Sequence, residues 1–335
     1  MNHISRIGSV WRVVLCVPAA GLQPVDAVPI TALAFAPDGS ALVSNGDRCL
    51  DLRSSIDGAT QSLVACDLPK IASIAFAPGG KMLAVGGGEP GVRGEVRLLS
   101  WPSGKLLQRL TNHTDVVTQV AFDSAGSRLG VASADHTAGV WHLTEKSEPD
   151  IAFTLTGHAG PVLALAFSPS GQSLVTAGAD RSLKVWSSGD GRLLRSFSHH
   201  TEAIHTLAFR PGASAAEAAP VTCATGGDDR TVRLWQPEIG RMVRIVRRHE
   251  GPVFALAWST DATALFSAGK EGIIRRIDAT SDTIKNQWQA HDDWIYSLAA
   301  SPDGTTLASG DWSGRVRIHD LRAMERAPIK EGRNP

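Results

Sequence analysis

One short pattern recurs seven times along this chain. It is a turn, a run of alternating small and apolar residues, a large apolar residue, and a turn rich in Pro, Gly and Asp. The landmark apolar positions lie between 41 and 49 residues apart; they are Phe35, Phe76, Phe122, Phe167, Phe209, Trp258 and Ala300. A period near forty residues that holds only strand-like segments is typical of one supersecondary unit used repeatedly.

The fourth repeat shows how one unit is expected to fold. Its strand-like segments are separated by turn signals at Gly157-His158, at Pro169-Ser170-Gly171 and at Ala179-Asp180-Arg181. A sheet of four short antiparallel strands cannot bury both of its faces alone. Packing each sheet against its neighbours in a closed ring buries both faces. The repeats therefore predict an all-β ring of seven sheets.

Two repeats carry a set of four polar residues at fixed spacing. These residues are His158, Thr176, Asp180 and Trp186 in the fourth repeat, and His200, Thr225, Asp229 and Trp235 in the fifth. This pattern resembles the WD-repeat β-propellers, in which the four residues form a hydrogen-bonded tetrad within each blade. The resemblance covers nearly the whole chain. It implies a seven-bladed β-propeller of four-stranded antiparallel blades, closed by an N-terminal strand.

The other repeats depart from the tetrad. The third keeps His113, Asp135 and Trp141, with Val131 at the hydroxyl position. The remaining substitutions are Glu271 and Ile277 for Asp and Trp in the sixth repeat, Ser313 and His319 for Asp and Trp in the seventh, and Asp26 and Asp67 for His in the first two. The Trp-Asp pair itself is absent, so the resemblance depends on the spacing and on the seven phased repeats.

The chain divides into three parts on this interpretation: an N-terminal segment (1–26), the propeller (27–320) and a charged tail without regular structure (321–335). The seventh repeat ends after its third strand, so we expect Trp11–Val17 to supply the missing outer strand beside Arg315–Asp320. The alternative for residues 1–26 is a cleaved signal peptide, because Arg12 precedes a short apolar run. A cytoplasmic location is preferred over export.

Composition narrows the classes of partner. Lys+Arg and Asp+Glu are both 33, so the chain lacks the basic balance typical of nucleic-acid binding. The Arg residues at 241, 244, 247 and 248 favour a solvated outer edge over an anionic partner. No apolar run is long enough to span a membrane. The four cysteines, Cys16, Cys49, Cys66 and Cys223, form no Cys-x-x-Cys pair and are expected to be free thiols.

No motif in the sequence predicts catalysis, a cofactor or a metal. Five histidines lie nine residues before their landmark residues; they are His113, His158, His200, His249 and His291. Each is expected in its own blade, too far from the others to share a tetrahedral site. The glycine-rich run at 86–94 lies between two strands and lacks the helix that a phosphate site uses, so an enlarged turn is expected there.

These observations favour a non-enzymatic scaffold that binds other proteins, as a monomeric ring within a complex. The resemblance implies docking on the narrower face of the ring, where aromatic residues gather in the last three repeats. The predicted partner-binding residues are His205, Asp228, Phe254, Lys270, Trp294, Tyr296 and Trp312. Two alternatives remain: a small-molecule or enzymatic propeller that uses the central channel, and a sensor module of an exported complex.

Overall fold

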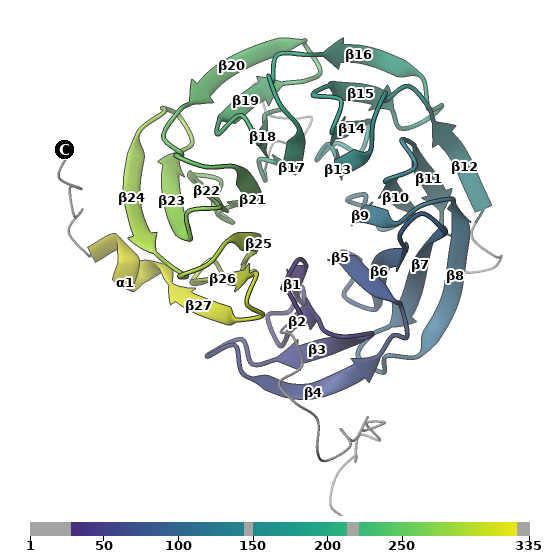
Figure 1. Ribbon diagram of the computed structural model, residues 1–335, viewed down its shortest axis with the longest axis horizontal. Coiled ribbons are helices and arrows are strands. Elements are labelled where there is room, and N and C mark those ends of the chain that lie inside the picture. Colours follow the sequence, from purple (N-terminus) through teal and green to yellow (C-terminus); the bar gives the residue numbers. More distant parts are fainter. Residues whose placement is uncertain (1–27, 144–149, 213–220, 327–335) are drawn as a thin grey trace, which may run out of the picture.

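The computed structural model describes residues 28–143, 150–212 and 221–326. In these residues the chain forms seven antiparallel sheets around a central axis, and the first strand of each sheet lies nearest that axis (Figure 1). Each sheet is a blade, numbered 1 to 7 in chain order. Blades 1 to 6 have four strands and blade 7 has three among the described residues. The predicted seven-bladed β-propeller is confirmed.

The strands follow one another in chain order within every blade. Blade 1 holds β1 (Leu33–Phe35), β2 (Leu42–Asn45), β3 (Cys49–Arg53) and β4 (Thr60–Ala65). Blade 2 holds β5 (Lys70–Phe76), β6 (Met82–Glu89), β7 (Arg93–Ser100) and β8 (Leu106–His113). Blade 3 holds β9 (Val117–Phe122), β10 (Arg128–Ser133), β11 (Ala138–His142) and β12 (Asp150–Leu155). Blade 4 holds β13 (Val162–Phe167), β14 (Ser173–Gly178), β15 (Leu183–Ser187) and β16 (Leu193–Phe197).

The last three blades repeat the arrangement. Blade 5 holds β17 (Ile204–Phe209), β18 (Cys223–Gly227), β19 (Val232–Gln236) and β20 (Arg241–Val246). Blade 6 holds β21 (Val253–Trp258), β22 (Ala264–Gly269), β23 (Ile273–Asp278) and β24 (Ile284–Gln289). Blade 7 holds β25 (Ile295–Ala300), β26 (Thr306–Asp311) and β27 (Val316–Asp320). The glycine-rich run at 86–94 forms the turn and adjoining residues of the long β6–β7 hairpin.

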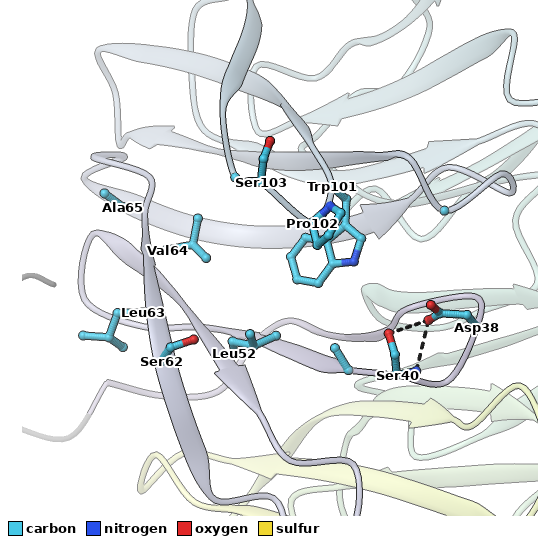
Figure 2. A pocket seen from close by; sticks show the side chains of 13 residues that line it. Asp38, Ser40, Leu52, Ser62, Leu63, Val64, Ala65, Trp101, Pro102 and Ser103 are labelled. Atoms are coloured by element: carbon cyan, nitrogen blue, oxygen red, sulfur yellow. Dashed lines mark hydrogen bonds between the residues drawn. The ribbon is translucent and has the colours of Figure 1, made fainter. Parts of the chain in front are cut away.

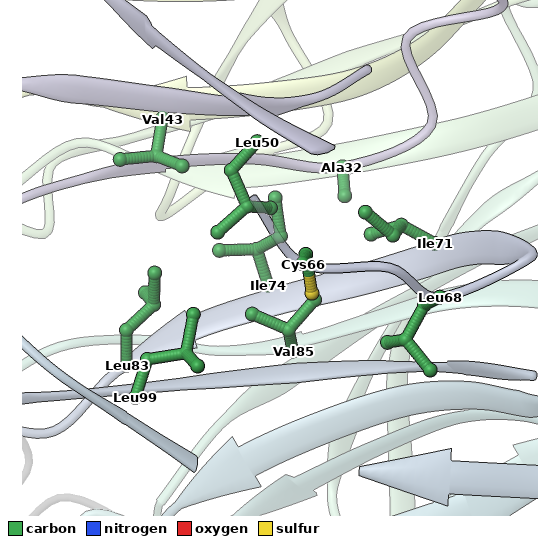
Figure 3. Packing of buried hydrophobic residues seen from close by; sticks show 10 residues of the cluster. All are labelled: Ala32, Val43, Leu50, Cys66, Leu68, Ile71, Ile74, Leu83, Val85 and Leu99. Carbon is green, nitrogen blue, oxygen red and sulfur yellow. The ribbon is translucent and has the colours of Figure 1, made fainter. Parts of the chain in front are cut away.

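Burial falls from the middle of each blade to the rim. Every residue of β14 is buried, because neighbouring blades cover both faces of blade 4. The outer strand β16 of the same blade is exposed at four of its five residues. The hydrophobic clusters accordingly lie between blades: Figure 3 shows Val43 and Leu50 of blade 1 facing Leu83 and Leu99 of blade 2. Each blade is stabilised by its neighbours on both sides.

Blade 7 meets blade 1 through the inner strands. The amide of Ile30 donates to the carbonyl of Asp311 at 2.9 Å, and the hydroxyl of Ser297 donates to the carbonyl of Ile30 at 2.9 Å. Phe35, Leu42 and Ala308 form a small core at this seam. The strand expected at Trp11–Val17 lies outside the described residues.

A short helix, α1 (Leu321–Arg326), follows β27, where the sequence analysis expects an irregular tail. That expectation is wrong for these six residues. The carboxylate of Asp320 accepts hydrogen bonds from the amides of Arg322 and Ala323, which caps the first turn. Leu321 is buried in the blade 6–blade 7 core, and this contact anchors the helix.

Three of the four cysteines, Cys49, Cys66 and Cys223, lie in the described residues, and Cys66 and Cys223 are buried free thiols. Cys16 lies outside that part of the chain. No helix among the described residues is long and apolar enough to cross a membrane.

Candidate interaction surface and the polar networks behind it

Blade 4 contains a complete tetrad. The Nδ1 of His158 lies 3.0 Å from the carboxylate of Asp180, and its Nε2 lies 2.8 Å from the hydroxyl of Thr176. The indole Nε1 of Trp186 donates to the same hydroxyl at 2.8 Å. These bonds join the loop before β13 to β14, to the β14–β15 turn and to β15. The network therefore fixes the geometry of the whole blade.

Blade 5 repeats this network with one addition. His200 contacts Asp229 and Thr225 at 2.8 Å each, and Trp235 donates to Thr225 at 2.8 Å. The guanidinium of Arg233 also donates to Asp229 at 3.0 Å. Asp229 consequently has a permanent positive partner that its counterpart in blade 4 lacks.

In blades 4 and 5 the tetrad carboxylates remain ionised and the tetrad histidines remain neutral. Burial raises the pKa of Asp180, but hydrogen bonds from His158, Ala159 and Ser182 outweigh it and hold this pKa below its ordinary value. Burial lowers the pKa of His158, and the neighbouring carboxylate offsets only part of the shift. These groups therefore serve as fixed hydrogen-bonding partners near neutral pH.

Blade 3 lacks the hydroxyl of the tetrad. The Nδ1 of His113 lies 2.9 Å from Asp135, as in the complete blades. The Nε2 of His113 and the Nε1 of Trp141 are both buried without a hydrogen-bond partner in the described residues. Val131 stands at the position that Thr176 occupies in blade 4, and its methyl groups cannot bond to either nitrogen.

Blade 6 replaces the tetrad with an ionic network. The Nε2 of His249 lies 2.8 Å from the hydroxyl of Ser267, and its Nδ1 accepts from Arg275 at 3.0 Å. Arg275 also bonds to Glu271. Burial raises the pKa of Glu271, but His249 and Arg275 lower it to about 2. Glu271 thus takes the carboxylate position predicted from the sequence.

Blade 7 has a full network of a different composition. Ser313 stands at the position of the tetrad Asp, as predicted from the sequence, but nothing in the sequence indicated that another residue supplies the carboxylate. Asp311 supplies the carboxylate from β26, with Oδ2 at 2.7 Å from Nδ1 of His291. His319 occupies the Trp position as expected, and its Nε2 lies 2.8 Å from the hydroxyl of Ser309. Asp311 is equivalent to Gly178 of blade 4. Comparison with the complete tetrad of blade 4 therefore could not indicate a carboxylate at this position.

Blade 1 contains a substitution that the sequence analysis missed. Arg53 pairs with Leu42 across the sheet, which is the Trp position, and its Nε donates to the hydroxyl of Ser44 at 2.7 Å. Arg53 also forms an ion pair with Asp51 at 2.7 Å. Burial lowers the pKa of Arg53 and raises the pKa of Asp51. The Trp-like role of Arg53 follows from the strand register, which the spacing of the sequence does not contain.

The five tetrad-position histidines lie in five different blades, as expected. Among residues 28–143, 150–212 and 221–326, no group of three His, Cys, Asp or Glu side chains is arranged to hold a metal ion.

The aromatic residues singled out in the last three repeats lie together, and three of them, His205, Phe254 and Tyr296, line the central channel. The ring of Phe254 stacks on Tyr296 with centroids 4.8 Å apart and planes 10° apart. The ring of His205 contacts the ring of Phe254 edge-on, with centroids 5.2 Å apart. The ring centroids of Trp294 and Phe254 are 6.0 Å apart, and those of Trp312 and Tyr296 are 5.6 Å apart. We call these five residues the aromatic surface.

Charged groups border this surface. The ammonium of Lys270 lies 5.2 Å from the ring centroid of Trp294, within cation–π distance. The Nε2 of His205 lies 2.8 Å from a carboxylate oxygen of Asp228, at an angle outside a normal hydrogen bond. Burial and the charge of Asp293 raise the pKa of Tyr296, so its hydroxyl stays protonated.

The aromatic surface also remains accessible. Trp312 is 52% exposed and Trp294 is 38% exposed, and both are among the exposed large apolar side chains of the described residues. A rival explanation holds that these two tryptophans pack together in place of a missing blade 7 tetrad. Their ring centroids are 6.4 Å apart, but the His291–Asp311 network occupies the tetrad position independently.

The central channel is small. Its lining includes one residue per blade at equivalent positions: Thr31, Ala72, Thr118, Leu163, His205, Phe254 and Tyr296. The cavity has a volume of about 200 Å³. Hydroxyl groups in the lining bond to the next blade, as when Thr31 donates to the carbonyl of Ile71 and Thr118 to that of Val162.

Seven antiparallel blades, most of them centred on a His–hydroxyl–carboxylate network, define a repeat propeller that can present loops from every blade on one face. A family model described as WD domain, G-beta repeat matches residues 104–142, 150–187, 191–236, 240–278 and 283–320. These segments cover more than half of the chain, and the chain therefore belongs to the WD-repeat family. Strands β1 to β7 precede the first matched residue, and they belong to the two blades without the His of the tetrad.

Among curated proteins, Coronin-7 of Rattus norvegicus is 39% identical over 74 residues. The match covers 22% of this chain and 8% of that protein. The chain thus spans a small part of the relative's length. WD-repeat propellers are typically protein-interaction modules, and this general role applies to the fold described here.

Proposed function

We propose that this protein is a non-enzymatic scaffold that binds a protein partner through the aromatic surface, with Asp228 and Lys270 at its border. The observation that carries the proposal is the unbroken ring contact from His205 through Phe254 to Tyr296. These three residues hold the same position in consecutive blades. Blades 1 to 4 have small or aliphatic residues there.

Rigid aromatic groups with a polar border are the usual composition of interface hot spots. The rings here are held by one another, so docking would immobilise few additional side chains. The central channel supports the small-molecule alternative less well. Its volume of about 200 Å³ lies below the range of about 300–1,000 Å³ that is usual for ligand pockets.

The experiment compares three forms of the full chain in affinity capture from cells of its source. The double variant Tyr296→Ala with Trp312→Ala is expected to weaken capture at least about tenfold, which corresponds to about 1.4 kcal/mol. The control is Leu194→Ala, an equally simple truncation at a 44% exposed apolar residue on the outer strand β16. It should leave capture unchanged.

A photo-crosslinking residue at position 312 gives a direct readout of contact. We expect it to form an adduct with the captured partner, and the same residue at position 194 to form none. Undiminished capture by the folded double variant, together with no adduct at position 312, would move the interface elsewhere.

A further inference from the structure

The outer strand of blade 1 differs from all other outer strands in the described residues. Strand β4 has the sequence TQSLVA and carries no charged residue. The outer strands of blades 2 to 6 each carry at least one: Arg109 in β8, Asp150 in β12, Arg195 in β16, Arg241 and Arg244 in β20, and Lys285 in β24. Only β3 is hydrogen-bonded to β4 in this part of the chain.

An outer strand presents unpaired N–H and C=O groups, and charged side chains are a common device that prevents a second strand from adding there. Charge has a particular effect when the second strand belongs to another copy of the same chain. Two identical antiparallel strands meet across a twofold axis, so a charged residue near the axis faces its own like charge. Among the outer strands of the described residues, β4 alone has no charge at any position, so it can pair with itself in every register without this repulsion.

The groove beside β4 also carries little charge. A groove of about 680 Å³ runs beside the strand between blades 1 and 2 (Figure 2). Figure 2 shows Val64 directed toward Trp101 across this groove, and Leu63 on the opposite side of the strand. Asp38 is the one charged residue in the lining, and its carboxylate accepts hydrogen bonds from the hydroxyl and amide of Ser40.

We propose that two copies of this chain associate by antiparallel pairing of β4 with β4, which joins the two blade 1 sheets into one continuous sheet. The partner is a second copy because the lack of charge makes the strand self-complementary, whereas a strand built for a different partner is free to carry charge complementary to it. The pairing lies on the outer rim and leaves the aromatic surface of blades 5 to 7 accessible. It is independent of the proposed scaffold function.

Sedimentation velocity of the full chain over a concentration series tests the pairing. The wild type should approach twice the chain mass of 35.4 kDa as its concentration rises. The double variant Gln61→Lys with Leu63→Lys, which places like charges across the axis, should sediment as a single chain. Gln61→Lys alone changes an exposed residue and should shift the equilibrium in the same direction without affecting folding.

Charge rescue and a matched control make the result specific to β4. The corresponding Gln61→Glu with Leu63→Glu variant should also be a single chain, and an equimolar mixture with the Lys variant should restore the two-chain species. Thr154→Lys, an exposed residue at the equivalent register position of β12, should leave association unchanged. A wild type of single-chain mass throughout the series, or a Lys variant with a native melting curve that still associates, overturns the proposal.

Discussion

The Nε2 of His113, at the end of β8, and the Nε1 of Trp141, in β11, are both buried, and neither has a hydrogen-bond partner among the described residues. In blade 4 the hydroxyl of Thr176 bonds to both equivalent atoms, and in blade 3 Val131 takes its place. Each unbonded polar group in an apolar interior lowers stability. Blade 3 is therefore less stable than a complete blade, and one substitution that supplies a hydroxyl group can remove the difference.

Val131→Thr is expected to stabilise the protein, because one hydroxyl would donate to His113 and accept from Trp141. Leaving a buried polar group unbonded costs about 1–3 kcal/mol, and we expect the free energy of unfolding to rise by an amount in this range. Chemical denaturation measures the change. The mirror variant Thr176→Val should lower it; a decrease in both variants would contradict the explanation.

The tetrad carboxylates should be needed for stability. Asp180→Ala leaves His158 and the turn amides without a charged acceptor, at an expected cost of about 1.5–3 kcal/mol. Asp229→Ala should cost more, because it also leaves Arg233 buried without its carboxylate. The control is Asp190→Ala, whose side chain is 61% exposed. Equal melting temperatures for all three variants would argue against a stabilising role of the network.

Blade 7 should make folding sensitive to mild acid. The indole of Trp288 donates to Nδ1 of His319, whose Nε2–H donates to Ser309. Ser309 donates to His291, whose Nδ1–H donates to Asp311. His291 and His319 are both neutral in this series of hydrogen bonds, and protonation of His319 would remove the acceptor for Trp288.

Burial, the repulsion from a protonated His291 and the charge of Arg317 lower the pKa of His319 to about 4 from an ordinary value of 6.5. The unfolded chain therefore binds a proton between these pH values that the folded chain does not bind, and stability falls as pH drops from 6.5 toward 4. His319→Trp, which restores the residue found in blades 4 and 5, should reduce the slope by up to about 1.4 kcal/mol per pH unit. Denaturation midpoints over this pH range measure it, and an unchanged slope would contradict the assignment.

The N-terminal segment is the remaining candidate for the outer strand of blade 7. If Trp11–Val17 pairs with β27, deletion of residues 1–17 should lower the melting temperature and expose a strand edge that promotes aggregation. Deletion of residues 1–9 is the matched control and should have little effect. An equally soluble and equally stable 1–17 deletion would favour a signal peptide instead.

The sequence predicted the ring, because the inner strands repeat with a fixed period and each blade needs its neighbours to bury both faces. It also placed the complete networks of blades 4 and 5, whose spacing is regular. The sequence did not predict the networks in which a different type of residue, or a residue at another position, forms the equivalent hydrogen bond. Arg53 donates where Trp donates in other blades, and Asp311 reaches its histidine from within a strand, two residues before the position that spacing indicated.

The helix α1 was missed for a related reason. Its sequence is short and charged, and contacts outside the helix fix its place: the capping by Asp320, the burial of Leu321 in the blade 6–blade 7 core, and a hydrogen bond from the side-chain amide of Asn286 to the carbonyl of Met324. The grouping of the aromatic residues was predicted from their equivalent positions in consecutive repeats. The contact of Lys270 with Trp294 depends on side-chain conformations that no spacing contains.

The hydroxyl–carbonyl bonds that cross from one inner strand to the next have a mechanical consequence. Thr31, Thr118 and Ser297 tie their blades to the following one by such bonds, whereas His205 and Phe254 hold the corresponding seams of blades 5 and 6 by ring contacts. A partner that covers these rings would therefore directly contact the residues that connect blades 5, 6 and 7. Binding of a partner to the aromatic surface would then slow hydrogen exchange in β17, β21 and β25. The residues that contact the partner would thus also determine the rigidity of blades 5 to 7.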